Sequence, residues 1–153
     1  MRLTLHTDYA LRLLMLLALE PEGVHTIEEV ARRYAISRNH LTKVAQTLAQ
    51  AGFIDSQRGR GGGLRLARAA EAINLGEVVR ATEDGFTLVE CFAPASSTCV
   101  LVPACGLAGP LAEALAAFMA VLDGYALADM TAGRGRAGKL RRLLAEDVEE
   151  ASP

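Results

Sequence analysis

The chain has 153 residues, enough for one compact domain or for a small domain with an appendage. Half of its residues are hydrophobic, which excludes a wholly disordered chain. The net charge of −2 argues against a nucleic-acid partner, but residues 1–70 hold ten Lys and Arg against six Asp and Glu. Because binding to a polyanion depends on a local basic face, the first half is the candidate for nucleic-acid binding.

Two apolar stretches could be taken for membrane segments. The first, "LLMLLAL" (Leu13–Leu19), directly follows Arg12 and precedes "EPEG" where a signal peptide would have small residues. The second, at 113–130, is interrupted by three acidic residues and is too charged to span a bilayer. We therefore expect no membrane association and a cytoplasmic protein, in which thiols stay reduced.

The stretch "TDYALRLLMLLALEPEG", residues 7–23, predicts the first helix. Pro21 and Gly23 are expected to end it. Apolar residues recur along it at helical spacing: Leu11, Leu14, Met15 and Ala18.

A second helix is predicted from "TIEEVARRY", with Thr26 as N-cap and Glu29 completing a capping box. Arg32 and Arg33 are expected to point away from its apolar face, which consists of Ile27, Val30, Ala31 and Tyr34.

After the three-residue turn "AIS", a third helix is predicted from "RNHLTKVAQTLAQAG". Ser37 can cap its start, and Gly52 stands where a C-terminal glycine belongs. Its buried stripe is expected to be Leu41, Val44 and Leu48.

"FIDSQRGRGGGLRLA" then predicts two short strands, Phe53–Ser56 and Leu64–Ala67, joined by a basic, glycine-rich tip. Helix, turn, helix and hairpin in this order are typical of a winged helix-turn-helix. The predicted fold class is mainly α with a small β-hairpin wing, in which residues 1–82 form the DNA-binding domain.

Several polar side chains are suited to contact DNA. Those at the start of the third helix can reach base edges or phosphates, and the arginines of the hairpin tip suit phosphate or minor-groove contacts. The alternative is a solvated helix face with a mobile turn. The candidate DNA-binding residues are Thr26, Ser37, Arg38, Asn39, Lys43, Arg58 and Arg60.

The second half predicts a helix from "NLGEVVRATE", a cysteine-rich loop at 83–109 and a long helix at 110–131. A flexible tail is expected at 132–153, with a short helix around Leu140–Leu144. A lone helix with a continuous apolar stripe needs a partner surface, so we expect the long helix to mediate dimerisation. That stripe consists of Leu111, Leu115, Phe118, Leu122 and Tyr125.

All three cysteines, Cys91, Cys99 and Cys105, lie in the loop with the spacing C-x7-C-x5-C. Structural zinc sites favour tight C-x-x-C pairs, whereas these looser gaps suit an iron–sulfur cluster. The fourth ligand would have to come from outside the loop, which contains no His. Three unligated thiols remain the alternative on composition alone, because free Cys is a common buried small hydrophobe.

Six segments carry a resemblance to a known family: "TDYALRLLMLLA", "SRNHLTKV", "GRGGGLRLA", "LGEVVRATE", "LVEC" and "PACGL". In this order, over about residues 1–130, they closely resemble the NsrR-type repressors, part of a winged-helix superfamily that also includes the IscR type. The resemblance implies a homodimer that binds a palindromic operator as double-stranded DNA. It also implies an iron–sulfur cluster in each cysteine loop, typically [4Fe–4S], whose attack by nitric oxide lowers DNA affinity.

The resemblance also bears on the remaining ligand. The IscR type has a His three residues after the third Cys, but Ala108 stands there, which excludes that scheme. The first gap, seven residues, is a little longer than usual for the NsrR type. In that type the remaining ligand can be an oxygen from the first helix of the other subunit, and the matching residue is the partner subunit's Asp8. Arg12 lies one turn further on, where it can pair with Asp8; a plain surface ion pair is equally consistent with this spacing.

The function expected from these observations is a homodimeric, nitric-oxide-sensing repressor with a [4Fe–4S] cluster. One alternative is a [2Fe–2S] regulator that senses iron–sulfur or redox status. Another is an iron–sulfur electron carrier or interaction protein. No paired carboxylates, Ser/His/Asp set or nucleotide-binding loop supports catalysis, so we do not expect an enzyme.

Overall fold

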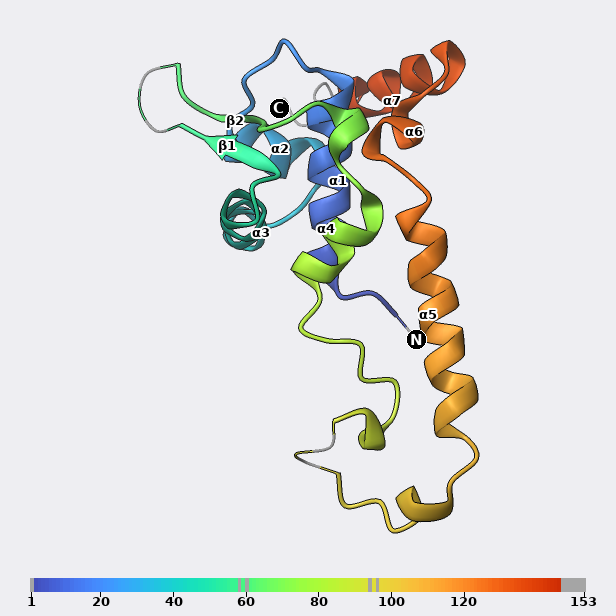
Figure 1. Cartoon of the computed structure of the whole chain (residues 1–153). Coiled ribbons are helices and arrows are strands. Elements are labelled where there is room, and N and C mark those ends of the chain that lie inside the picture. The colour runs from blue at the N-terminus through green and yellow to red at the C-terminus, as the bar shows by residue number, and fades with distance from the viewer. Residues whose placement is uncertain (1, 58, 60, 94, 96, 147–153) are drawn as a thin grey trace.

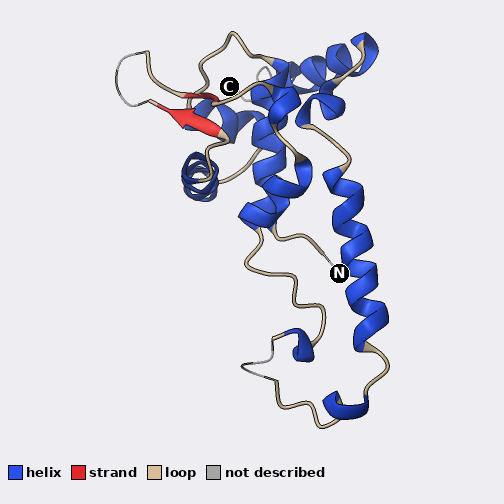
Figure 2. Ribbon diagram, in the orientation of Figure 1, coloured by secondary structure: helices blue, strands red, loops and turns tan. Residues whose placement is uncertain are grey.

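The computed structural model describes residues 2–57, 59, 61–93, 95 and 97–146, which are mainly helical (Figures 1 and 2). The predicted fold class is confirmed, with one antiparallel hairpin as the wing. In chain order the elements are α1 (Leu5–Leu19), α2 (Ile27–Arg33), α3 (Arg38–Gln50), β1 (Ile54–Ser56), β2 (Leu64–Leu66), η1 (Ala70–Ala72), α4 (Leu75–Thr82), η2 (Glu90–Phe92), η3 (Val102–Ala104), α5 (Ala108–Asp123), α6 (Leu127–Thr131) and α7 (Arg134–Glu146).

Helix α1 forms the centre of the hydrophobic core and contacts α3, α4, α6 and β2. Its buried residues are Thr7, Ala10, Leu13, Leu14, Leu16, Leu17 and Leu19. Of the stripe predicted from the sequence, only Leu14 is fully buried, while the other three residues are half-buried. Leu11, Met15 and Ala18 still pack against the core, because neighbours cover α1 on several sides.

The helix-turn-helix follows the predicted caps. The hydroxyl of Thr26 accepts a hydrogen bond from the Glu29 backbone N–H, and that of Ser37 accepts one from the His40 N–H. These bonds satisfy N–H groups that have no partner within the first turn of a helix. The predicted stripe of α3, Leu41, Val44 and Leu48, is completely buried.

Arg33 was expected to point away from the core, but its side chain is only 11% exposed. Its guanidinium donates to both carboxylate oxygens of Glu20, at 2.6 and 2.9 Å. This contact holds the pKa of the Glu20 carboxyl below its ordinary value. Only half of the predicted capping box is formed, the bond from the Glu29 N–H to Thr26. The Glu29 carboxylate instead lies 3.4 Å from Nδ1 of the buried His25 and 3.5 Å from Arg33. The sequence pattern did not predict the inward position of Arg33, because Glu20, at the C-cap of α1, and His25, in the following loop, belong to another part of the chain.

The wing pairs Ile54 with Leu66 and Ser56 with Leu64, both strands being slightly shorter than predicted. The backbone of His25 adds two further hydrogen bonds to Leu64, of 2.8 and 3.2 Å, and so joins the hairpin to the segment before α2. The wing is therefore anchored to the helix-turn-helix at its base.

Helices α4 and α5 pack against each other and flank the cysteine loop, which extends away from the winged-helix domain (Figure 1). Arg80 of α4 donates two hydrogen bonds to Asp123, the last residue of α5, at 2.6 and 2.7 Å. A Cβ at Gly76 would lie 1.8 Å from the Asp123 carboxylate, so a larger residue there would displace the Asp123 and Arg80 side chains. The long helix predicted at 110–131 is divided, since α5 ends at Asp123 and α6 begins at Leu127.

Four residues of the expected stripe are half-buried and its last residue, Tyr125, is exposed, while the one buried residue of α5 is Met119, outside that stripe. Val121, on α5, is 61% exposed, and Tyr125, just after α5, is 48% exposed. This chain therefore leaves much of the apolar surface of α5 uncovered. Among the described residues, no helix is both long enough and apolar enough to cross a membrane.

Residues 132–153 were expected to form a flexible tail with a short helix around Leu140–Leu144, but helix α7 is longer and spans Arg134–Glu146. Residues 147–153 lie outside the described part of the chain. Arg141 donates to the backbone carbonyl of Leu19 at 2.7 and 3.2 Å, and Arg33 donates to that of Leu144 at 3.3 Å. Leu144 is buried in the core, whereas its neighbour Leu143 is 52% exposed. Helix α7 is thus docked on α1 and α2.

The docking of α7 predicts different effects for two adjacent leucines. Leu144→Ala should lower the free energy of unfolding by about 2 kcal/mol, near the lower end for a buried leucine because α7 is peripheral. Leu143→Ala, an exposed substitution, should change it by less than about 0.5 kcal/mol. Urea denaturation followed by circular dichroism measures both. Equal effects would contradict the docked position of α7.

Candidate nucleic-acid interface and cysteine loop

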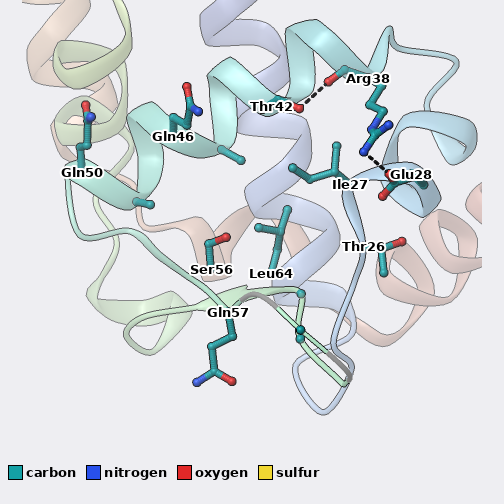
Figure 3. Close-up of a pocket in the computed structure, with 15 residues that line it drawn as sticks. Thr26, Ile27, Glu28, Arg38, Thr42, Gln46, Gln50, Ser56, Gln57 and Leu64 are labelled. Carbon is teal, nitrogen blue, oxygen red and sulfur yellow. Dashed lines mark hydrogen bonds and ion pairs between the residues drawn. The ribbon is translucent and has the colours of Figure 1, made fainter.

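A groove of about 710 Å³ runs between α3, the start of α2 and the wing (Figure 3). Its walls come from the elements that the sequence assigned to DNA recognition. Of the candidate DNA-binding residues, Thr26 and Arg38 line it. The groove is where the helix-turn-helix and the wing meet on one side of the molecule.

Four residues of α3 line this groove at intervals of four, Arg38, Thr42, Gln46 and Gln50. Residues at this spacing share one face of a helix. The two glutamines are exposed and were not among the predicted site residues, nor were Ser56 and Gln57 on the wing side. The i, i+4 spacing was visible in the sequence and could have identified the glutamines.

Thr26 and Ser37 hold the starts of the two helices through their caps. As hydrogen-bond acceptors, both hydroxyls keep a proton that can be donated to a phosphate oxygen. Asn39 and Lys43 are exposed on α3 outside the groove lining. Arg58 and Arg60 lie outside the described residues, while Gly59 and Gly61 beside them adopt positive φ angles of 105° and 78°. Glycine is the residue that adopts such angles without strain.

A carboxylate lies in the same groove. Glu28, in the first turn of α2, forms an ion pair with Arg38, in the first turn of α3, with 2.6 Å between its Oε1 and Nη2 of the arginine (Figure 3). Both side chains are more than half exposed. Among the described residues that line the groove, these two carry the charges.

Over its described residues, the cysteine loop before α5 forms two short 3-10 turns, and its three cysteines are half-buried and free of disulfides. The Glu90 carboxylate beside Cys91 accepts hydrogen bonds from the backbone N–H and the hydroxyl of Thr98, next to Cys99. Those two bonds hold the pKa of Glu90 below its ordinary value. The Sγ of Cys105 accepts a hydrogen bond from the Leu107 N–H at 3.4 Å.

The cysteines are not gathered into a metal-binding group in this conformation. Over the part of the chain that is described, no three His, Cys, Asp or Glu side chains are close enough to hold an ion. Asp8 lies in the first turn of α1 and pairs with Arg12 at 2.7 Å, the i, i+4 contact that the sequence made possible. The loop between α4 and α5 extends beyond the first turn of its own α1 (Figure 1).

Contacts at the start of α1 link the cysteine loop to helix α3 of the candidate DNA interface. The backbone N–H and the hydroxyl of Thr4 donate to the Glu83 carboxylate at 2.8 and 3.1 Å, where the chain leaves α4 for the cysteine loop. Partial burial raises the pKa of Glu83, but hydrogen bonds from Thr7 and Thr4 outweigh it and the pKa is lowered. Nε2 of His6 lies 3.1 Å from the Thr47 hydroxyl on α3.

Comparison with known proteins gives consistent matches. The family model Rrf2, described as "Iron-dependent Transcriptional regulator", matches residues 3–133. The HTH-type transcriptional regulator NsrR of Bacillus subtilis (strain 168) is 49% identical over 144 residues, covering 94% of this chain and 99% of the relative. The NsrR of Shouchella clausii (strain KSM-K16) is 52% identical over 131 residues, covering 85% and 88%. The resemblance inferred from the sequence motifs is thereby confirmed.

Solved structures agree with the fold. The oxidised form of Staphylococcus aureus CymR is 26% identical with a TM-score of 0.65, covering 83% of this chain and 93% of that one. T. potens IscR, at 24% identity and a TM-score of 0.64 over 85% of both chains, shows the likeness of fold alone. As the sequence led us to expect, the relatives are regulators and not enzymes. The chain belongs to the Rrf2 family of DNA-binding transcriptional regulators.

Proposed function

We propose that this regulator is a homodimeric repressor that senses nitric oxide through a [4Fe–4S] cluster held by the cysteine loop. One observation carries the proposal: the loop that holds all three cysteines begins at Glu83, which is hydrogen-bonded to the start of α1, and α1 contacts α3. A change at the loop thus has a physical route to the DNA-binding helix.

The donor set of the loop fits an iron–sulfur cluster. Thiolates are the usual ligands of such clusters, and Cys91, Cys99 and Cys105 are free and half-buried on one irregular loop. The N–H of Leu107, donated to Cys105 Sγ, is the kind of contact that tunes cluster potential. The loop would have to close for the three thiolates to act together, which an irregular segment between α4 and α5 permits.

We assign the fourth ligand to the partner subunit's Asp8. A second copy packed along α5 would cover apolar surface that one chain leaves exposed, including Val121. The loop extends away from its own α1, so an α1 carboxylate can complete the site more readily from the other subunit (Figure 1). Arg12 pairs with Asp8 and would hold this carboxylate when it is not a ligand.

When bound, the cluster supplies iron that reacts with nitric oxide. The residues of the chain pass the change of ligation to α3. Release of Asp8 frees the first turn of α1, which contacts α3 through His6 and Thr47 and through the rings of Tyr9 and His40, 6.2 Å apart. A coupling of about 1–3 kcal/mol between the two sites would give a usable switch.

In the complex with DNA, we propose that the recognition helices of the dimer enter successive major grooves of a palindromic operator, as winged-helix dimers do. Arg38, Asn39 and Lys43 would contact bases or phosphates from α3, with Thr26 and Ser37 donating to the backbone. Arg58 and Arg60 would reach the adjacent groove from the wing tip.

The contribution of Lys43 can be measured on duplex DNA of random sequence. Lys43→Ala should weaken binding and reduce the slope of log affinity against log salt by about 0.9, because one phosphate contact is lost. Lys139→Ala removes the same charge from the exposed surface of α7 and should leave the slope unchanged. Fluorescence anisotropy at several salt concentrations gives both slopes. An unchanged slope for Lys43→Ala would remove it from the interface.

Sensing by the cysteine loop is tested by anaerobic purification. The wild-type protein should be brown, with the absorption and the iron-to-sulfide ratio of a [4Fe–4S] cluster, and nitric oxide should bleach it and weaken operator binding. Cys99→Ala should be colourless because one thiolate is missing. A brown Cys99→Ala protein, or metal-free protein that binds the operator as tightly as the loaded form, would contradict the proposal.

Asp8→Ala is the companion variant in that experiment. Because an oxygen ligand is replaced and all three thiolates remain, the variant should still be brown, but its colour should fade faster in the presence of a chelator. Arg12→Ala leaves the carboxylate in place and serves as its control. Equal fading of wild type and Asp8→Ala would exclude Asp8 as a ligand.

A further inference from the structure

The ion pair between Glu28 and Arg38 has no evident role in stability. The Glu28 and Arg38 side chains are 59% and 69% exposed, and exposed ion pairs add little to the stability of a protein. A carboxylate in a groove that faces DNA also repels phosphates. The position of Glu28 therefore calls for a role in DNA recognition.

The backbone at Arg38 is fixed by its neighbours. Ser37 caps α3, and the hydroxyl of Thr42 donates to the carbonyl of Arg38 at 2.9 Å. What remains free is the long side chain of Arg38, which has many rotamers. Glu28 restricts that side chain through its ion pair with one guanidinium nitrogen, Nη2. The guanidinium has five N–H donors, so others stay available to a ligand.

We propose that Glu28 is a positioning residue that sets the base specificity of Arg38. It holds the guanidinium at the edge of the groove and away from phosphates, so that the remaining donors meet the edge of a base. Guanine is the base whose O6 and N7 accept two bonds from an arginine. The proposal rests on the DNA contact assigned above to Arg38, and it adds the selectivity of that contact for a guanine.

A matched pair of variants distinguishes the positioning of Arg38 by Glu28 from the general effect of removing one negative charge. Glu28→Gln and Glu77→Gln remove the same charge, and each carboxylate pairs with an exposed arginine, but Glu77 pairs with Arg68 outside the groove. Each protein is used to select sequences from a randomised duplex library, and its affinity for duplex of random sequence is measured across salt concentrations. Thermal unfolding checks that both variants are folded.

For Glu28→Gln we expect the preference for guanine at one position of each half-site to fall about tenfold. Binding to random duplex should become tighter, with a salt slope steeper by about 0.9, because Arg38 gains a phosphate. Glu77→Gln should select the same sequence as wild type. If Glu28→Gln selects that sequence with undiminished preference, the proposal is overturned.

A double variant distinguishes positioning from repulsion. In an Arg38→Ala background, Glu28→Gln should have no further effect on base preference, because Glu28 acts through Arg38. An effect that persists without Arg38 would contradict the proposal. If the wild-type protein selects no sequence, sequence-specific recognition itself fails; selection that is unchanged in Glu28→Gln contradicts only the role of Glu28.

Discussion

Seven residues of α1 are buried, and α3, α4, α6 and β2 all contact this helix, so α1 cannot shift without moving its neighbours. Its first turn carries Asp8 and is bonded to Glu83 at the entry of the cysteine loop. The same turn reaches α3 through His6. A close-packed interior transmits such a displacement because it has little free volume to absorb it. The proposed sensing mechanism depends on this position of α1 between the loop and the DNA-binding helix.

The distribution of charged side chains along the chain says more about DNA binding than the net charge does. The first seventy residues carry the basic excess, yet the groove between α3 and the wing is lined mainly by neutral polar and small residues. Its charged pair, Glu28 and Arg38, is internally neutralised. Such a surface gains affinity for DNA from the surrounding cationic side chains, which contact phosphates. The sequence of the bases is recognised by side chains held in a fixed orientation. The proposed role of Glu28 follows from this division.

Local signals predicted the fold well where one helix or one turn decides the outcome. The caps at Thr26 and Ser37, the buried stripe of α3 and the pairing of Asp8 with Arg12 follow from spacing along a single helix. Contacts between elements could not be predicted in this way. Arg33 turns inward because Glu20 lies beside it, and Glu28 meets Arg38 because the turn between α2 and α3, with Ala35 at a φ of 51°, brings two helix starts together. The sequence of the cysteine loop has no periodic pattern, so the path of the loop could not be predicted from it.

The central claim is that α1 couples the cysteine loop to α3. Substitution of His6, which contacts α3, tests this claim most directly. The decisive measurement is the ratio of operator affinities before and after nitric oxide treatment, for wild type and for His6→Ala. Our account predicts that His6→Ala keeps the wild-type absorption spectrum and its bleaching while the ratio falls toward one, and that Thr47→Val, which removes the other partner, does the same. A His6→Ala protein that retains the full wild-type ratio would contradict coupling of α1 to α3 through the contact of His6 with Thr47.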